Sequence, residues 1–274
     1  MKDGKAAVTG EWSLGCGHCA AVCPVKAVTV GFVNGEALKF GTVEGAEEYL
    51  EPGAFDTASL LRLMRSRRSC RNYRERPVPR ELLEDLVRFG TTAPSGTNCQ
   101  LWTFTILPDR ESVQALAEAV ARFFRALNRK AENPALRLMA KIFMGDALGA
   151  YYREWHESVR DGLRLWDEEG KDLLFHGAPA LLLVGSRPGA TCPVEDTHLA
   201  CQNILLAAHA MGLGTCMVGI VVEALKHDPS IPGLLGIPAE EKTLAAITLG
   251  YPDETYLAPA GRRRVIPRYF RPPG

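Results

Sequence analysis

Apolar positions at helical spacing recur along most of the chain. The first helix is predicted after an N-cap at Asp56 or Thr57, and the next begins at Pro79, since proline suits the first turn of a helix. A long amphipathic helix is predicted for residues 112–130. Residues 194–211 are apolar on most sides, which indicates a deeply buried helix.

Three shorter segments have the composition of strands. Residues 101–107 are rich in β-branched and aromatic side chains, and residues 244–250 form a similar run. Residues 179–186 contain an unbroken Ala-Leu-Leu-Leu-Val run, which is typical of a strand covered on both faces. A few central strands among many helices predict one α+β domain over residues 56–274.

Two further segments precede that domain. Residues 1–31 contain a cysteine run, and residues 32–55 are rich in Gly and Glu and are predicted to be a linker. The 32 basic and 32 acidic side chains balance, which argues against a nucleic acid or an anionic membrane surface as partner. We expect no membrane span, because no apolar run reaches about 18 residues. Eight cysteines in 274 residues fit the reducing cytoplasm better than a disulfide scaffold.

The cysteine run reads C-x2-C-x3-C-P at Cys16, Cys19 and Cys23, and it resembles three-quarters of a bacterial ferredoxin motif. Ser13 stands where the first cysteine belongs, and no cysteine precedes it. We therefore expect a truncated ferredoxin-like remnant without an intact 4Fe–4S cluster, because serine is a poor substitute for a soft thiolate. A zinc site that includes His18 is an alternative. Free reduced thiols are the simpler interpretation.

Four short motifs offer candidate chemistry. Residues 67–71 carry three arginines and a serine that suit a phosphate, or a solvated helix end. Residues 93–102 form a polar turn that suits the edge of a flat heterocycle, or an ordinary loop. Residues 212–219 are glycine-rich and can present backbone N–H groups to a ligand, or cap the preceding helix. Residues 262–264 are three arginines that are either solvated or bound to an anion.

The order of these motifs, with Leu-Gly-Tyr-Pro at residues 249–252, resembles the nitroreductase family of FMN enzymes over roughly residues 56–270. The resemblance implies a three-layer fold in which helices flank a central, mostly antiparallel sheet. It also implies a homodimer whose two sites each use both subunits. The residues that it assigns to the FMN phosphate and ribityl chain are Arg67, Arg68, Ser69, Arg71, Arg262 and Arg263.

The resemblance assigns the flavin ring to two other segments. Pro94, Ser95 and Asn98 match the loop that reaches the flavin from the partner subunit. Val218 and Gly219 match the backbone near flavin N5. No catalytic side chain is expected, since the cofactor carries the reactivity.

The function implied is reduction of nitroaromatics, quinones or a related conjugated acceptor in a ping-pong cycle that uses NAD(P)H. Reduced ferredoxin is an alternative donor. Two other readings stay open: a non-catalytic flavin-binding or redox-sensing protein, and an electron-transfer protein fed by ferredoxin.

Overall fold

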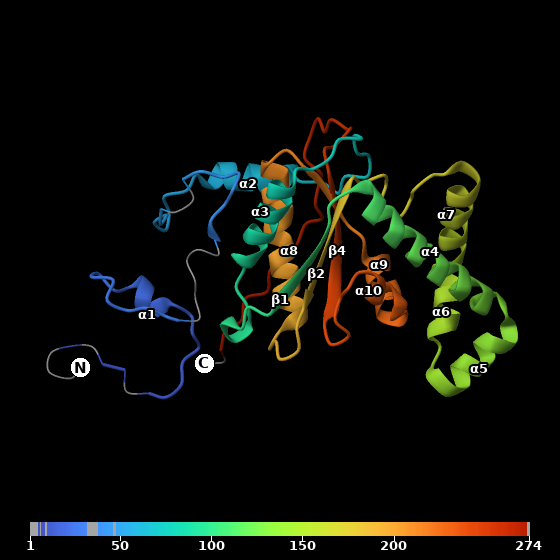
Figure 1. Ribbon diagram of the computed structural model, residues 1–274, viewed down its shortest axis with the longest axis horizontal. Helices are drawn as coiled ribbons and strands as arrows, with labels where there is room; N and C mark the ends of the chain where they lie inside the picture. The colour runs from blue at the N-terminus through green and yellow to red at the C-terminus, as the bar shows by residue number, and fades with distance from the viewer. Residues whose placement is uncertain (1–4, 6, 9, 32–37, 46–47, 273–274) are drawn as a thin grey trace.

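The computed structural model describes residues 5, 7–8, 10–31, 38–45 and 48–272. The strands and all α-helices except the first lie between residues 57 and 250 in the described part of the chain (Figure 1). In chain order the elements are α1 (His18–Ala21), α2 (Thr57–Ser66), α3 (Arg80–Thr91), the 3-10 turn η2 (Gly96–Asn98), β1 (Trp102–Leu107), α4 (Arg110–Glu132), α5 (Pro134–Met144), α6 (Ala147–Glu154), α7 (His156–Glu169), β2 (Ala180–Ser186), α8 (Pro193–Ala210), β3 (Gly214–Met217), α9 (Gly219–His227), α10 (Ser230–Leu234) and β4 (Lys242–Gly250).

The four described strands form one antiparallel sheet in the order β1-β2-β4-β3. In the central strand β2, Leu182 lies opposite Ile106 of β1 on one side and Ile247 of β4 on the other. The three predicted strand segments correspond to β1, β2 and β4. The predicted antiparallel α+β sheet is therefore confirmed.

Each face of the sheet packs against a separate layer of helices. Leu181 and Leu183 of β2 point to a core built with α4 and α9. The alternate residues Ala180, Leu182 and Val184 point to a second core built with α3 and α8. Successive side chains of a strand face opposite sides, so burial of all seven β2 residues requires both layers. The three-layer fold is thus confirmed, with the sheet between α8 and α4 in Figure 1.

Local chemistry fixes the helix ends. The Asp56 carboxylate accepts hydrogen bonds from the N–H groups of Ala58 (3.2 Å) and Ser59 (3.0 Å), which makes it the N-cap of α2. Asp109 caps α4 in the same way through the Ser112 N–H (2.8 Å). Among the residues that the structure describes, no helix combines the length and apolar character needed to cross a membrane.

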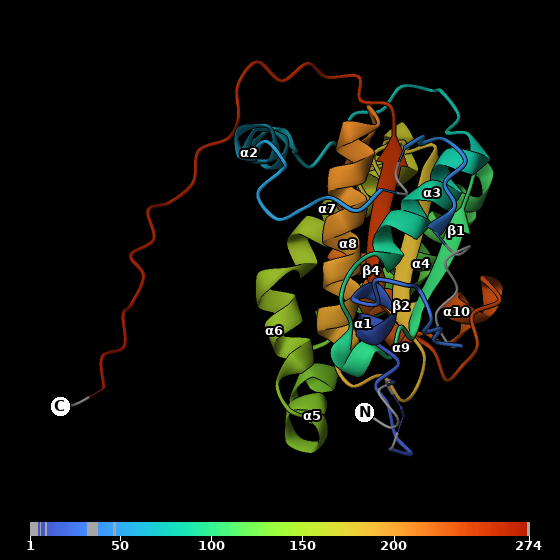
Figure 2. The ribbon, with the colours of Figure 1, turned by 90° about the vertical axis from the view of Figure 1, so that its left-hand side faces the viewer.

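The C-terminal segment after β4 leaves the body of the molecule. Figure 2 shows it running past α2 as an extended chain. Its large apolar side chains are strongly exposed; they are Leu257, Val265, Ile266, Tyr269 and Phe270. A run of exposed apolar side chains of this kind is typical of a surface that contacts another molecule.

Candidate functional site

A cavity of about 200 Å³ collects five of the predicted phosphate-binding residues. Its lining consists of Arg67, Arg68, Ser69, Arg71 and Arg262. Four guanidiniums and a hydroxyl therefore converge from two segments that lie almost 200 residues apart in the sequence. Arg263 is not part of this lining.

Backbone pairing holds the arginine segment at the edge of the sheet. Ser69 forms a parallel bridge with Thr215 of β3, and the Cys70 N–H donates to the Thr215 carbonyl at 2.8 Å. Further along, the Arg74 N–H donates to the Tyr251 carbonyl at 2.9 Å. The arginines thus extend from a stretch of backbone that continues the sheet.

The buried side chain of Tyr73 holds this segment in place through hydrogen bonds. The Tyr73 hydroxyl donates to the Cys70 carbonyl at 2.9 Å and lies 2.7 Å from the Thr248 hydroxyl on β4. The Thr248 hydroxyl has a single proton, which it donates either to the Tyr73 hydroxyl or to the Cys216 carbonyl at 3.2 Å. Burial raises the pKa of Tyr73, so its hydroxyl stays neutral. The network fixes the position of the arginines relative to β3 and β4.

The cavity has a positive potential that reaches two neighbouring imidazoles. Burial and the charge of Arg67 lower the pKa of His209, which lies near the end of α8. Burial also lowers the pKa of His176, where the effect of Arg71 is opposed by that of Asp172. The positive charge that disfavours protonation of these imidazoles also favours binding of an anion. A phosphate suits the cavity because its oxygens can accept two hydrogen bonds from one planar guanidinium.

The junction between β3 and α9 contains the two residues predicted to lie near flavin N5. The Val218 N–H donates to the Ala246 carbonyl at 2.9 Å, so it is already used by the sheet. Gly219 begins α9, and a side-chain carbon added there would meet nothing within 4 Å. Helix geometry leaves the first N–H groups of α9 without acceptors inside the helix. Gly219 is therefore better suited than Val218 to offer an N–H group to a ligand.

The predicted ring-binding loop and the arginine segment lie near opposite ends of α8. The Gly96 N–H donates to the Asp196 carboxylate at 2.9 Å, in the first turn of α8. Arg67 lies near His209 in the last turn of that helix. The step of 13 residues from Asp196 to His209 spans about 20 Å at the rise of an α-helix. Within one chain, Pro94, Ser95 and Asn98 are thus not brought to the cavity.

The loop itself has an unusual backbone. Thr97, Asn98 and Gln100 adopt φ angles of 51°, 55° and 49°, in the left-handed region that non-glycine residues seldom occupy. The Ser95 hydroxyl accepts the Gln100 N–H at 3.0 Å, and the Asn98 amide donates to the Gly15 carbonyl at 3.0 Å. Strained conformations of this kind persist where surrounding contacts impose them, and they cluster at functional sites.

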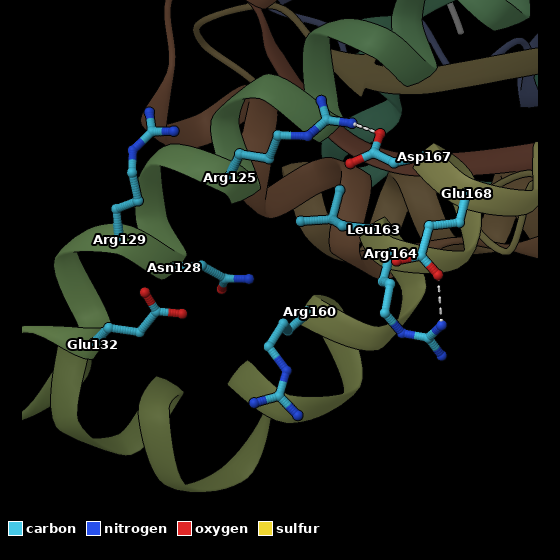
Figure 3. Close-up of a pocket in the computed structure, with 9 residues that line it drawn as sticks. All are labelled: Arg125, Asn128, Arg129, Glu132, Arg160, Leu163, Arg164, Asp167 and Glu168. Carbon is cyan, nitrogen blue, oxygen red and sulfur yellow. Dashed lines mark hydrogen bonds and ion pairs between the residues drawn. The ribbon is translucent and has the colours of Figure 1, made fainter.

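A larger hollow of about 350 Å³ lies between α4 and α7 and contains none of the predicted residues (Figure 3). Its charged side chains are largely paired: Arg125 with Asp167, and Arg164 with Glu168 at 2.9 Å. These charges are spread over two helices, so the sequence gives no motif for the hollow. It is lined by Arg125, Asn128, Arg129, Glu132, Arg160, Leu163, Arg164, Asp167 and Glu168.

The fold and the edge cavity define a three-layer α+β protein with an arginine-lined cavity beside its outer strand. The family model described as "Nitroreductase family" matches residues 64–251. The chain belongs to the nitroreductase family.

Its relatives differ in the reactions that their names state. The 4-nitrobenzoate reductase of Nocardioides sp. is 29% identical, with 70% of this chain and 79% of that protein covered. The iodotyrosine deiodinase of Haliscomenobacter hydrossis is 26% identical, with coverage of 80% and 91%.

Solved structures show the same fold. Oxidized iodotyrosine deiodinase bound to FMN and 3-iodo-L-tyrosine matches with a TM-score of 0.51 and 25% identity, covering 77% of this chain and 99% of that one. A nitroreductase with bound FMN from Bacteroides fragilis matches with a TM-score of 0.54 and 22% identity, covering 75% and 94%.

Proposed function

We propose that this chain uses FMN to reduce a nitroaromatic, a quinone or a related conjugated acceptor, with NAD(P)H as the donor. Its character as an FMN-dependent oxidoreductase follows from its family; the acceptor and the donor are the proposal. The observation that carries the use of FMN is the convergence of four arginines and Ser69 in one cavity beside β3, and the similarity to a 4-nitrobenzoate reductase supports the acceptor class.

The donor set of the cavity fits the phosphate of FMN. A phosphate monoester carries nearly two negative charges at neutral pH and three acceptor oxygens, which matches several planar guanidiniums and one hydroxyl. Arg67, Arg68, Arg71 and Arg262 would hold this group, and Ser69 would donate its hydroxyl. Gly219 would present its N–H group toward the ring, since open space surrounds it.

FMN held there would supply the two-electron redox chemistry between donor and acceptor. The residues of the chain bind and orient, and no side chain is assigned a catalytic proton transfer. The arginines neutralise the phosphate end. The Tyr73–Thr248 network keeps their segment from shifting when donor and acceptor exchange.

The separation of the two half-sites along α8 supports a homodimer. In this arrangement Pro94, Ser95 and Asn98 of one subunit would complete the site of the other. The exposed apolar side chains of the C-terminal segment support the same conclusion, because a second copy would cover them. Leu61 and Met64 of α2 are exposed as well, and α2 directly precedes the arginines.

Anaerobic stopped-flow spectroscopy tests the proposal. NADPH or NADH is expected to bleach the flavin absorbance, and a nitroaromatic or quinone is expected to restore it in a separate step. Reduced ferredoxin serves as the competing donor, and an iodinated tyrosine as a competing acceptor. A yellow protein whose flavin no nicotinamide reduces, or whose reduced flavin no acceptor reoxidises, would contradict the proposal and favour a flavin-binding sensor.

A further inference from the structure

The segment before the α+β domain is anchored to α3 by a buried carboxylate. Asp85 is fully buried, and its carboxylate accepts the N–H groups of Gly41 (3.0 Å) and Thr42 (2.6 Å) and the Thr42 hydroxyl (2.6 Å). The Phe40 ring packs against Phe89 at 4.7 Å between centroids. Residues 38–45 therefore form a strap that is tied to the domain.

A second contact places the cysteine run beside the strained loop. The Asn98 amide donates to the Gly15 carbonyl at 3.0 Å, and Gly15 directly precedes Cys16. Under the proposed function, Asn98 borders the flavin of the partner subunit. In that arrangement this hydrogen bond would bring Cys16 to the rim of the partner's flavin site, while the strap limits how far the leading segment can move from the domain.

The three cysteines of the run are not equivalent. Cys16 and Cys19 are exposed, and neither thiol takes part in a hydrogen bond among the described residues. The Cys23 sulfur accepts the Ala27 N–H at 3.3 Å, and this and neighbouring backbone N–H groups lower the pKa of Cys23. In the part of the chain that the structure describes, no three Cys, His, Asp or Glu side chains converge as metal ligands. Cys16 and Cys19 are two free, exposed thiols at C-x2-C spacing.

The backbone between the pair is ordered as a turn. Gly17 has φ of 73°, and its carbonyl accepts the N–H groups of Ala20 (3.0 Å) and Ala21 (2.9 Å). A C-x2-C spacing is the one at which two thiols within a turn undergo reversible oxidation in dithiol proteins.

We propose that Cys16 and Cys19 form a reversible dithiol–disulfide pair that is reduced by the FMN of the partner subunit. This rests on the proposed function. The disulfide accepts two electrons and two protons, its S–S bond breaks and two thiols form. The flavin returns to its oxidised state, and NAD(P)H supplies the electrons. The disulfide would thus be a second electron acceptor for the flavin, besides the small-molecule acceptor.

Differential alkylation with peptide mass spectrometry tests the pair directly. The FMN-loaded protein is oxidised with glutathione disulfide, then treated anaerobically with NADPH or NADH. We expect a Cys16–Cys19 disulfide that disappears as the donor is consumed. Cys19→Ser should leave Cys16 as a mixed disulfide with glutathione, whereas the matched variant Cys23→Ser should behave like the wild type.

A strap variant tests the role of position. Thr42→Val removes a hydrogen bond to Asp85 without touching the cysteines or the loop. It should slow reduction of the disulfide by NAD(P)H by at most about 10-fold, the effect of one lost hydrogen bond on docking of the strap, because the tether sets the effective concentration. Reduction by dithiothreitol should be unchanged.

Three outcomes overturn the inference. They are failure of the pair to form a disulfide at any glutathione ratio, stoichiometric iron bound to the anaerobic protein, and a disulfide that persists after the flavin is bleached. If NAD(P)H does not bleach the flavin, the proposed function fails instead. Photoreduced FMN then tests the pair independently, and persistence of the disulfide still counts against it.

Discussion

Arg67→Ala should weaken FMN binding by about 1.5–3 kcal/mol, the scale of one charge-assisted hydrogen bond. Arg67 is one of four guanidiniums lining the cavity, so three remain to hold the phosphate. The loss corresponds to a dissociation constant roughly 10- to 150-fold higher, at about 1.4 kcal/mol for each factor of ten. The fold should be unaffected, because Arg67 follows α2 and is not part of either helix–sheet core.

Titration of the apoprotein, followed by quenching of flavin fluorescence, measures this change. Riboflavin lacks the phosphate, so the variant should bind it like the wild type. Arg65→Ala is the matched control, because Arg65 lies in the last turn of α2 but does not line the cavity. The variant should also raise the pKa of His209, since the charge of Arg67 helps to lower it. An unchanged FMN constant, or an equal loss for riboflavin, would refute the assignment and return residues 67–71 to a solvated helix end.

Three further predictions concern the surroundings of the site. Tyr73→Phe should lower the free energy of unfolding by about 1–2 kcal/mol, because it removes two buried hydrogen bonds. Urea titration measures this change, and an unchanged midpoint contradicts the anchoring role of Tyr73. Ending the chain after Arg264 keeps Arg262 but removes four exposed apolar side chains. Sedimentation velocity should then show the dimer shifting toward monomer. An equally stable dimer, or a monomeric wild type, contradicts the role of the C-terminal segment in dimer formation. Burial would raise the pKa of Asp85, but hydrogen bonds from Thr42, Gly41 and Arg88 outweigh burial and lower it below 3.8. The strap should therefore stay docked at pH values above the lowered pKa of Asp85 and be released as the pH falls through it. Hydrogen exchange at the Thr42 amide, corrected for intrinsic rates, measures this release. Release near neutral pH contradicts the prediction.

Periodicity predicts the elements that are long or buried on both faces. The Ala-Leu-Leu-Leu-Val run marked β2 because a strand between two helix layers has no polar face. The apolar character of residues 194–211 reflects the place of α8, which packs against β2, β4 and α3. Strand β3 has only four residues, too few for an alternating pattern, and it was predicted only as part of a glycine-rich connection.

The chemistry of the site could be predicted from the sequence, but the spatial arrangement of its residues could not. The chemistry of guanidiniums indicated a phosphate at residues 67–71, whereas the convergence with Arg262 was expected only from the family resemblance, because the two segments lie almost 200 residues apart. Asp85 shows a different limit. It lies among the apolar positions of α3, and its partners, Gly41 and Thr42, belong to a segment predicted to be a linker. The role of a buried carboxylate can be inferred only when the groups that donate hydrogen bonds to it are known.

The length of α8 has a consequence for mixtures of subunits. If each site takes its arginines from one chain and its loop from the other, a chain defective at Arg67 and a chain defective at Asn98 can rescue each other. In a mixed dimer both defects fall in the same site, and the second site is assembled wholly from intact parts. Random pairing would restore about a quarter of all sites. Two inactive alleles of this protein would then complement, which a site confined to one chain does not allow.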